Sequence, residues 1–263
     1  MVRLAAGLSG DTVHGPDRQR SRGVAFLTVR IETVKQTAST NADLKALAAQ
    51  GSAIEGYWLR AETQSGGIGR LGRKWESPQG NLYCSTVVDI RPGDPSPSSL
   101  SFVAGLAVYT VIRSCLPGTE MILKWPNDIL VSQAKICGIL LERVKDQVVV
   151  GIGVNVAVTP EVEGRILTSL AGEGATIDAA GFLDRLSGTF AAFVKDWREL
   201  GIPHILSEWQ KLAHPVGSTV TTSDERGEKT TGEYAGLTAD GALCLRKADG
   251  TLIEIRAGDI SIG

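Results

Sequence analysis

The chain has 263 residues, of which 43% are hydrophobic and 21% are charged, so it is long enough for one large or two unequal domains with buried cores. Its formal net charge of −2 gives no reason to expect nucleic acid or an anionic membrane as a partner. Its four cysteines lie far apart without a C-x-x-C pair, which argues against a zinc knuckle or a disulfide framework and favours a reduced, cytoplasmic protein.

The N-terminal segment has no hydrophobic periodicity and no apolar core of the kind found in signal peptides, so we expect residues 1–23 to be a disordered tail. The β-branched run over 24–34 predicts a strand. The polar run 39–41 then predicts the start of a helix that ends at Gly51, and a short strand over 56–62 leads into a glycine-rich loop.

The centre of the chain combines short strands with one apolar helix. We expect strands over 81–90, on both sides of a sharp turn in 121–132, and in both arms of a hairpin that turns at 145–147. The segment that stops at Pro117 is apolar for most of its length and too regular for a loop, so it predicts a buried helix. No uninterrupted apolar run reaches the roughly 18 residues of a membrane span. Short connections between strands favour an α+β fold with a mixed, largely antiparallel sheet.

The C-terminal third begins with predicted helices and ends with predicted strands. An amphipathic helix is predicted over 177–200 and a shorter one over 203–213, whereas the Thr- and Gly-rich sequence after His214 is typical of a small β-barrel. The predicted parts are a disordered tail (1–23), a catalytic domain (24–213) and a C-terminal barrel domain (214–263).

The run ETQSGGIGRLGRKW, residues 62–75, contains the spacing G-x-G-x-x-G. A dinucleotide-binding turn of that spacing needs a helix that opens inside it. Pro78 and Gly80 would break such a helix within two turns, so the context argues against a dinucleotide site.

The same loop carries positive charge on Arg70, Arg73 and Lys74, and the flat surface of Trp75. Its glycines remove side chains, so that backbone N–H groups can approach an anion closely. We interpret it as a loop that folds over a phosphorylated ligand; the alternative is a solvated basic turn.

A second charged motif is KWPND, residues 124–128. Lys124 ends an apolar strand, where an ammonium group is costly unless it finds an anion. Asn127 and Asp128 place polar groups where they could contact a phosphate or its metal. On its own, the motif could equally be a capped turn with a surface lysine.

Four motifs together resemble the biotin protein ligases, or biotin–[acetyl-CoA-carboxylase] ligases, in order and spacing. They are STN (39–41), ETQSGGIGRLGRKW (62–75), KWPNDILVSQAKICGILLE (124–142) and GIGVNV (151–156). The KWPND…K…GIL.E block distinguishes this family from the lipoate ligases that share its fold. The resemblance runs from about Val34 to the C-terminus and implies a class II synthetase-like catalytic domain followed by an SH3-like barrel.

The resemblance implies a two-step reaction. The carboxylate of biotin attacks the α-phosphorus of ATP, with Mg²⁺ on the phosphates, and releases pyrophosphate to give biotinyl-5′-AMP. A lysine of the biotin carboxyl-carrier protein of acetyl-CoA carboxylase, or of a related carboxylase, then displaces AMP. Both steps crowd negative oxygens together, so fixed cations and backbone donors can supply most of the catalysis.

The resemblance also implies residue roles. Lys124 and Arg70 are expected to be catalytic. The residues expected to bind biotin are Ser39, Thr40, Asn41, Gln64, Ile68, Gly69, Arg70 and Lys124. Those expected to bind the nucleotide are Gly67, Arg73, Trp75, Asn127, Lys135 and Asn155. The metal ligands are not fixed by the sequence.

One position departs from the family pattern. The family usually has G-R-G-R in the glycine loop, and here Ile68 replaces the first arginine. Losing one guanidinium predicts weaker binding of biotin or faster loss of the adenylate. Two alternatives therefore stay open: a lipoate or other acyl-acid ligase of the same fold, and a non-catalytic biotin- or adenylate-binding protein weakened by Ile68.

The expected partners follow from the same reading. The segment before Val24 is too short for the winged helix-turn-helix that some family members use to repress transcription, so we expect no binding to nucleic acid. No membrane association is expected. An unpaired edge of the sheet could support a homodimer.

Overall fold

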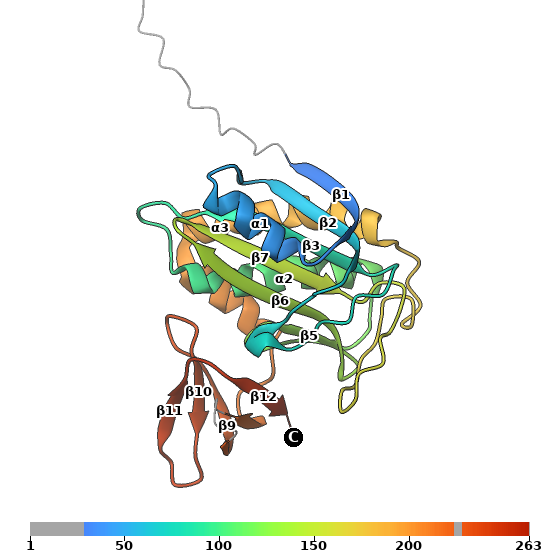
Figure 1. The fold of residues 1–263 in the computed structure, drawn as a ribbon. Coiled ribbons are helices and arrows are strands. Elements are labelled where there is room, and N and C mark those ends of the chain that lie inside the picture. Colours follow the sequence, from blue (N-terminus) through green and yellow to red (C-terminus); the bar gives the residue numbers. More distant parts are fainter. Residues whose placement is uncertain (1–28, 224–227, 263) are drawn as a thin grey trace, which may run out of the picture.

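A computed structural model of the protein describes residues 29–223 and 228–262 (Figure 1). The predicted disordered tail, residues 1–23, lies outside the described residues. The described chain forms a seven-stranded sheet, helices on both of its faces, and a five-stranded C-terminal sheet.

The large sheet is mixed, because its edge pair β1–β2 is parallel and every other neighbouring pair is antiparallel. This confirms the predicted mixed, largely antiparallel sheet. In spatial order the strands are β1 (Arg30–Thr37), β2 (Tyr57–Gln64), β3 (Leu82–Asp89), β7 (Gln147–Val154), β6 (Ala134–Val144), β5 (Asp128–Val131) and β4 (Met121–Lys124).

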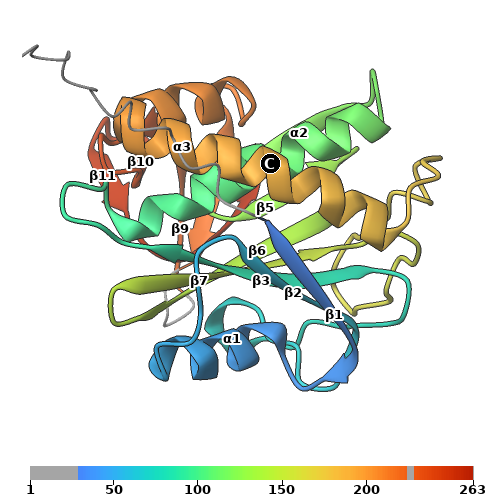
Figure 2. The same cartoon turned by 90° about the horizontal axis from the view of Figure 1, so that it is seen from above.

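Helices α2 and α3 cover one face of this sheet and α1 covers the other (Figure 2). Their bounds are α1 (Thr40–Ala49), α2 (Leu100–Cys115) and α3 (Ala179–Lys211). By length and composition residues 97–115 could cross a membrane, but 67% of that apolar window is buried inside the molecule. The predicted buried helix is therefore a core helix, which packs beside α3 on the same face of the sheet.

Helix α3 bends where two helices are predicted. Gly201 interrupts it with φ 76°, a left-handed conformation that glycine adopts without steric cost, and Pro203 follows two residues later. The two predicted helices are therefore the two arms of one bent element. The first arm is fixed to the start of α2, because Trp197 Nε1 donates to Ser99 Oγ at 2.7 Å.

The C-terminal sheet is antiparallel throughout and lies below the large sheet in Figure 1. Its strands in spatial order are β11 (Leu252–Ile255), β10 (Leu243–Arg246), β9 (Lys229–Leu237), β8 (Thr219–Ser223) and β12 (Asp259–Ile262). Trp125, in the turn after β4, donates through Nε1 to Gly241 O at 3.1 Å. The KWPND turn is thus in contact with both sheets.

Candidate active site

A cavity of about 450 Å³ is lined by residues of the large sheet and of β12 in the C-terminal sheet. That volume suits a small organic ligand. It collects most of the predicted site residues: Ser39, Thr40, Asn41, Gln64, Ile68, Gly69, Arg70, Arg73, Trp75, Lys124, Asn127 and Lys135.

A buried polar network lines one end of the cavity, at the start of α1. Thr40 N and Thr40 Oγ1 donate to Gln64 Oε1 at 2.9 and 3.2 Å. Ser85 Oγ, on β3, lies 2.7 Å from Thr40 Oγ1 and donates to Asn41 Oδ1 at 2.6 Å. Asn41 Nδ2 in turn donates to Glu142 Oε2 at 2.9 Å. These bonds fix the positions of the donors and acceptors before a ligand binds, as recognition of a polar ligand requires.

Ser39 serves two structural purposes at this end. It is the N-cap of α1, because its side chain accepts from Ala42 N, and its side chain also lines the cavity. The predicted helix start and the predicted binding role therefore fall on the same residue.

The glycine loop is a small hairpin. Gly69 N donates to Arg73 O at 2.7 Å, and Trp75 N donates to Gly67 O at 2.9 Å. Leu71 and Gly72 turn the chain with φ values of 57° and 69°. No helix follows the loop before β3, in agreement with the argument against a dinucleotide turn.

Trp75 lies across bare backbone of the large sheet. A Cβ on Gly153 of β7 would approach its ring to 2.6 Å, and one on Gly138 of β6 to 2.8 Å. The ammonium of Lys135 lies 5.3 Å from the centre of the ring. These two glycines leave the space that the indole ring occupies.

Asn127 ties the KWPND turn to the glycine loop. Its Nδ2 donates to Ile139 O at 2.6 Å, and its Oδ1 accepts from Arg70 Nη1 at 3.1 Å. The predicted nucleotide-side residue therefore positions one of the predicted catalytic residues.

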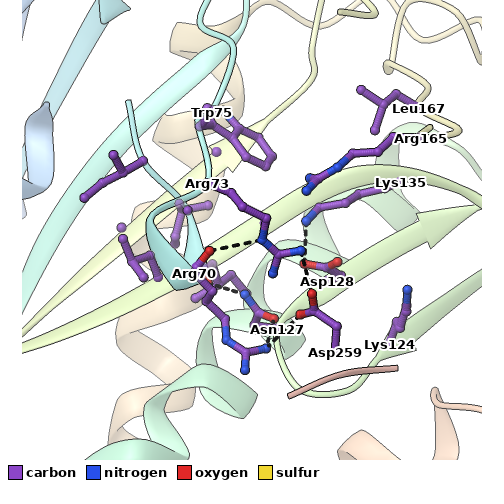
Figure 3. Close-up of a pocket in the computed structure, with 18 of the residues that line it drawn as sticks. Arg70, Arg73, Trp75, Lys124, Asn127, Asp128, Lys135, Arg165, Leu167 and Asp259 are labelled. Atoms are coloured by element: carbon purple, nitrogen blue, oxygen red, sulfur yellow. Dashed lines mark hydrogen bonds and ion pairs between the residues drawn. The ribbon is translucent and has the colours of Figure 1, made fainter. Parts of the chain in front are cut away.

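Asp259, the first residue of β12, neutralises the loop arginines. Its carboxylate lies 2.5 Å from Arg73 Nη1 and 3.7 Å from Arg70 Nη1, while Arg70 Nη2 donates to Gly258 O at 3.0 Å (Figure 3). Burial alone would raise the pKa of Asp259, but the bond from Arg73 and the charges of both arginines hold that pKa below its usual value. The C-terminal sheet thus contributes an anion to the cavity wall.

Lys124 is half-buried at the end of β4, and its ammonium group has no hydrogen-bond or ion-pair partner among the described residues. Burial lowers its pKa, and the positive charge of Lys135 adds to this effect. Lys135 is different, because its Nζ lies 2.7 Å from Asp128 Oδ1. A desolvated, unpaired ammonium is a strong attractor for an anionic ligand.

The sequence relationships agree with this geometry. Residues 34–156 match the Biotin/lipoate A/B protein ligase family, and residues 216–263 match the Biotin protein ligase C terminal domain. The biotin–[acetyl-CoA-carboxylase] ligase of Mycobacterium tuberculosis is 35% identical over 238 residues, which are 88% of this chain and 88% of that protein. The chain belongs to the biotin protein ligase family.

Other relatives agree with this assignment, and the predicted resemblance is confirmed. The biotin–[acetyl-CoA-carboxylase] ligase of Paracoccus denitrificans is 34% identical over 242 residues, covering 87% of this ligase and 98% of that one. The solved biotin protein ligase from Aquifex aeolicus, in complex with biotin and ATP, has a TM-score of 0.77 at 28% identity over 89% of this chain and 98% of that chain.

Two predicted site residues of this biotin ligase lie outside the cavity wall. Gly67 is buried behind the loop, where a Cβ would lie 2.8 Å from Ser77 Oγ. Asn155 is buried, and its Nδ2 donates to Thr168 O at 2.9 Å. Both therefore shape the loops that line the cavity in this structure.

Other lining residues of the ligase are not predicted as site residues from the sequence. They are Tyr83, Gly138, Gly151, Gly153, Arg165, Ile166, Leu167, Asp259 and Ile260, among others. The sequence does indicate Gly151 and Gly153, because two glycines separated by one residue in a strand leave the same face of the sheet without side chains. The residues contributed by the 164–167 segment and by β12 carry no comparable signal.

The described residues of the ligase contain no group of three or more His, Cys, Asp or Glu side chains arranged to hold a metal ion. The two acids at the cavity, Asp128 and Asp259, are paired with Lys135 and Arg73.

Proposed function

We propose that this protein catalyses the reaction for which its family is named. It is an ATP-dependent ligase that joins biotin to acetyl-CoA carboxylase, at a lysine of the biotin carboxyl-carrier protein, through biotinyl-5′-AMP. The observation that carries the proposal is that one cavity combines a preorganised polar end, at Thr40 and Asn41, with the unpaired ammonium of Lys124.

The polar end would hold the ureido ring of biotin, because Ser39, Thr40, Asn41 and Gln64 offer both donors and acceptors there. Lys124 would attract the biotin carboxylate and the α-phosphate and neutralise the charge that builds up between them. Arg70 and Arg73 would close on the adenylate as its phosphate takes the place of Asp259. The indole ring of Trp75 would flank the nucleotide.

The partner and the setting follow from this activity. The carboxyl-carrier protein is the acceptor, and the reaction requires neither nucleic acid nor a membrane. The edge strand β1 is unpaired on its outer side within the described chain and could pair two copies into a homodimer. The four cysteines are free thiols, which suits the cytoplasm.

The direct test is to incubate the purified protein with biotin, MgATP and a carboxyl-carrier domain. Mass spectrometry should show one added biotinyl group on the carrier and release of pyrophosphate. A parallel reaction with lipoate in place of biotin should leave the carrier unmodified. An unchanged carrier in the biotin reaction would refute the proposal.

Replacing Ile68 by Arg should tighten biotin binding. Ile68 is 48% exposed at the cavity, so a longer side chain can enter without displacing the core. One added charge-assisted hydrogen bond should strengthen binding about tenfold, measured by titration calorimetry. Leu71→Arg is the matched control, because it adds the same charge on the same loop but outside the cavity. Equal effects of the two variants would show that general charge, not the position, matters.

Replacing Asp259 by Asn should strengthen MgATP binding a few-fold, because Arg70 and Arg73 lose the carboxylate that competes with phosphate. The loss of stability should stay below about 1 kcal/mol, since this ion pair is partly exposed. Binding is measured by calorimetry and stability by thermal unfolding. Asp240→Asn is the control, because Asp240 pairs with Arg256 away from the cavity. Weaker MgATP binding in Asp259→Asn would mean that the carboxylate aligns the arginines instead of competing for them.

A further inference from the structure

The cationic side chains that line the cavity fall into two groups. Within the described chain, Arg70 and Arg73 pair with Asp259, Lys74 pairs with Glu76 at 2.8 Å, and Lys135 pairs with Asp128. The remaining cations of the wall are Lys124 and Arg165, and neither has a hydrogen-bond or ion-pair partner for its charged group among the described residues. Free positive charge in this cavity therefore resides at two points, and the sequence indicates only the first.

Arg165 is held at the wall by its neighbours in the chain. The backbone of Lys135 donates to Ile166 O at 2.9 Å and accepts from Thr168 N at 3.1 Å, which forms a short parallel bridge beside β6. Asn155 Nδ2 fixes the same segment by donating to Thr168 O. Arg165 directly precedes this anchored stretch, so its backbone is held close to that of Lys135.

The two unpaired cations differ in depth. Lys124 is half-buried, whereas Arg165 is exposed at the cavity wall. They also interact electrostatically: the lowered pKa of Lys124 is due mainly to burial, and the positive charge of Arg165 contributes to it. A ligand that contacts both groups must extend from the interior to the rim and carry negative charge at both ends. Biotin has a single carboxylate, whereas MgATP has a chain of three phosphates.

We propose that Arg165, on the 164–167 segment, binds the outer phosphates of ATP. This inference rests on the proposed function. In the adenylation step a bond forms between a carboxylate oxygen of biotin and the α-phosphorus. The bond from that phosphorus to the bridging oxygen breaks, and pyrophosphate leaves with the electron pair. Arg165 neutralises the charge that gathers on this leaving group.

Titration calorimetry of Arg165→Ala against MgATP and against biotin tests the assignment. We expect MgATP to bind about tenfold more weakly, the size of effect typical of a lost charge-assisted contact, and biotin without ATP to bind as in the unaltered protein. Arg165→Lys keeps the charge but not the fork of donors, so it should lose less. Arg143→Ala is the control, because it removes an exposed guanidinium at the far end of β6.

A double-mutant cycle asks whether positions 165 and 68 act independently. Because we expect position 68 to act on biotin and Arg165 on MgATP, Arg165→Ala should weaken MgATP binding by the same factor in the Ile68→Arg background as in the original chain. Unchanged MgATP affinity in Arg165→Ala, or an equal loss for biotin, would overturn the inference. If the unaltered protein biotinylates its carrier while Arg165→Ala binds MgATP normally, only this inference fails. An unaltered protein that does not biotinylate the carrier refutes the proposed function instead.

Discussion

Replacing Lys124 by Met should reduce the rate of biotinyl-AMP formation by roughly a hundredfold or more, the usual loss when one preorganised charge-stabilising group is removed. The ammonium group of Lys124 has no hydrogen-bond or ion-pair partner among the described residues, and methionine has a similar length, so the fold should persist. The rate is measured as pyrophosphate release in a single turnover. Unfolding temperature and circular dichroism check that the variant is folded.

Two companions sharpen this test. Lys124→Arg keeps a cation and should recover part of the rate. Burial lowers the pKa of Lys124, so the rate in the unaltered enzyme should fall as pH rises through that lowered pKa, because the ammonium loses its proton. Lys124→Met should lack that alkaline decline. A folded Lys124→Met variant with a nearly normal rate would show that the catalytic cation lies elsewhere in the cavity.

Replacing Gly153 by Ala should weaken MgATP binding by about tenfold or more, because the new methyl group takes space that the ring of Trp75 occupies. A Cβ at this position would lie 2.6 Å from Trp75 Cε2, so the indole ring must move. The ring also contacts Lys135, at 5.3 Å from its centre, and this contact would be lost with it. MgATP affinity is measured by calorimetry alongside the free energy of unfolding.

Gly188→Ala is the matched control for this substitution. A Cβ at Gly188, in α3, meets nothing within 4 Å, and alanine favours a helix, so the control should be neutral or slightly more stable. If Gly153 acts through the indole ring, Gly153→Ala should add little to the loss caused by Trp75→Ala. Additive losses would mean that the glycine contacts the ligand directly.

The sequence predicts the large sheet, its helices and the start of a separate β-rich part after His214, because each depends on local periodicity and turn residues. Gly201 and Pro203 likewise predict an interruption of the last helix. That its two arms form one bent element depends on packing against α2, where Trp197 meets Ser99, and local signals do not contain this information.

Part of the site could also be predicted from the sequence, because some of its residues stand out locally. Motif residues such as Thr40 and Lys124 are polar or charged at positions in a helix or strand where an apolar residue is more usual, and this indicates a binding role. Arg165 lies in a stretch for which the sequence predicts no helix or strand, and Asp259 lies in the Thr- and Gly-rich C-terminal part. Only the tertiary structure brings both to the cavity. Asn155 is the opposite case. It belongs to a sequence motif of the family, but in this structure it does not line the cavity and instead donates a hydrogen bond to the loop at Thr168.

The ion pair between the glycine loop and β12 has a consequence for the environment in which this ligase works. Arg73 and Asp259 are 40% and 42% exposed, so dissolved ions can reach and screen them. At physiological ionic strength the screening length is about 8 Å, and it shortens as salt is added. Concentrated salt would therefore loosen the loop from the C-terminal sheet while also weakening its hold on phosphate. The ionic strength of the medium would therefore change the balance between two competing ion pairs of the loop arginines, one with Asp259 and one with the phosphates of the substrate.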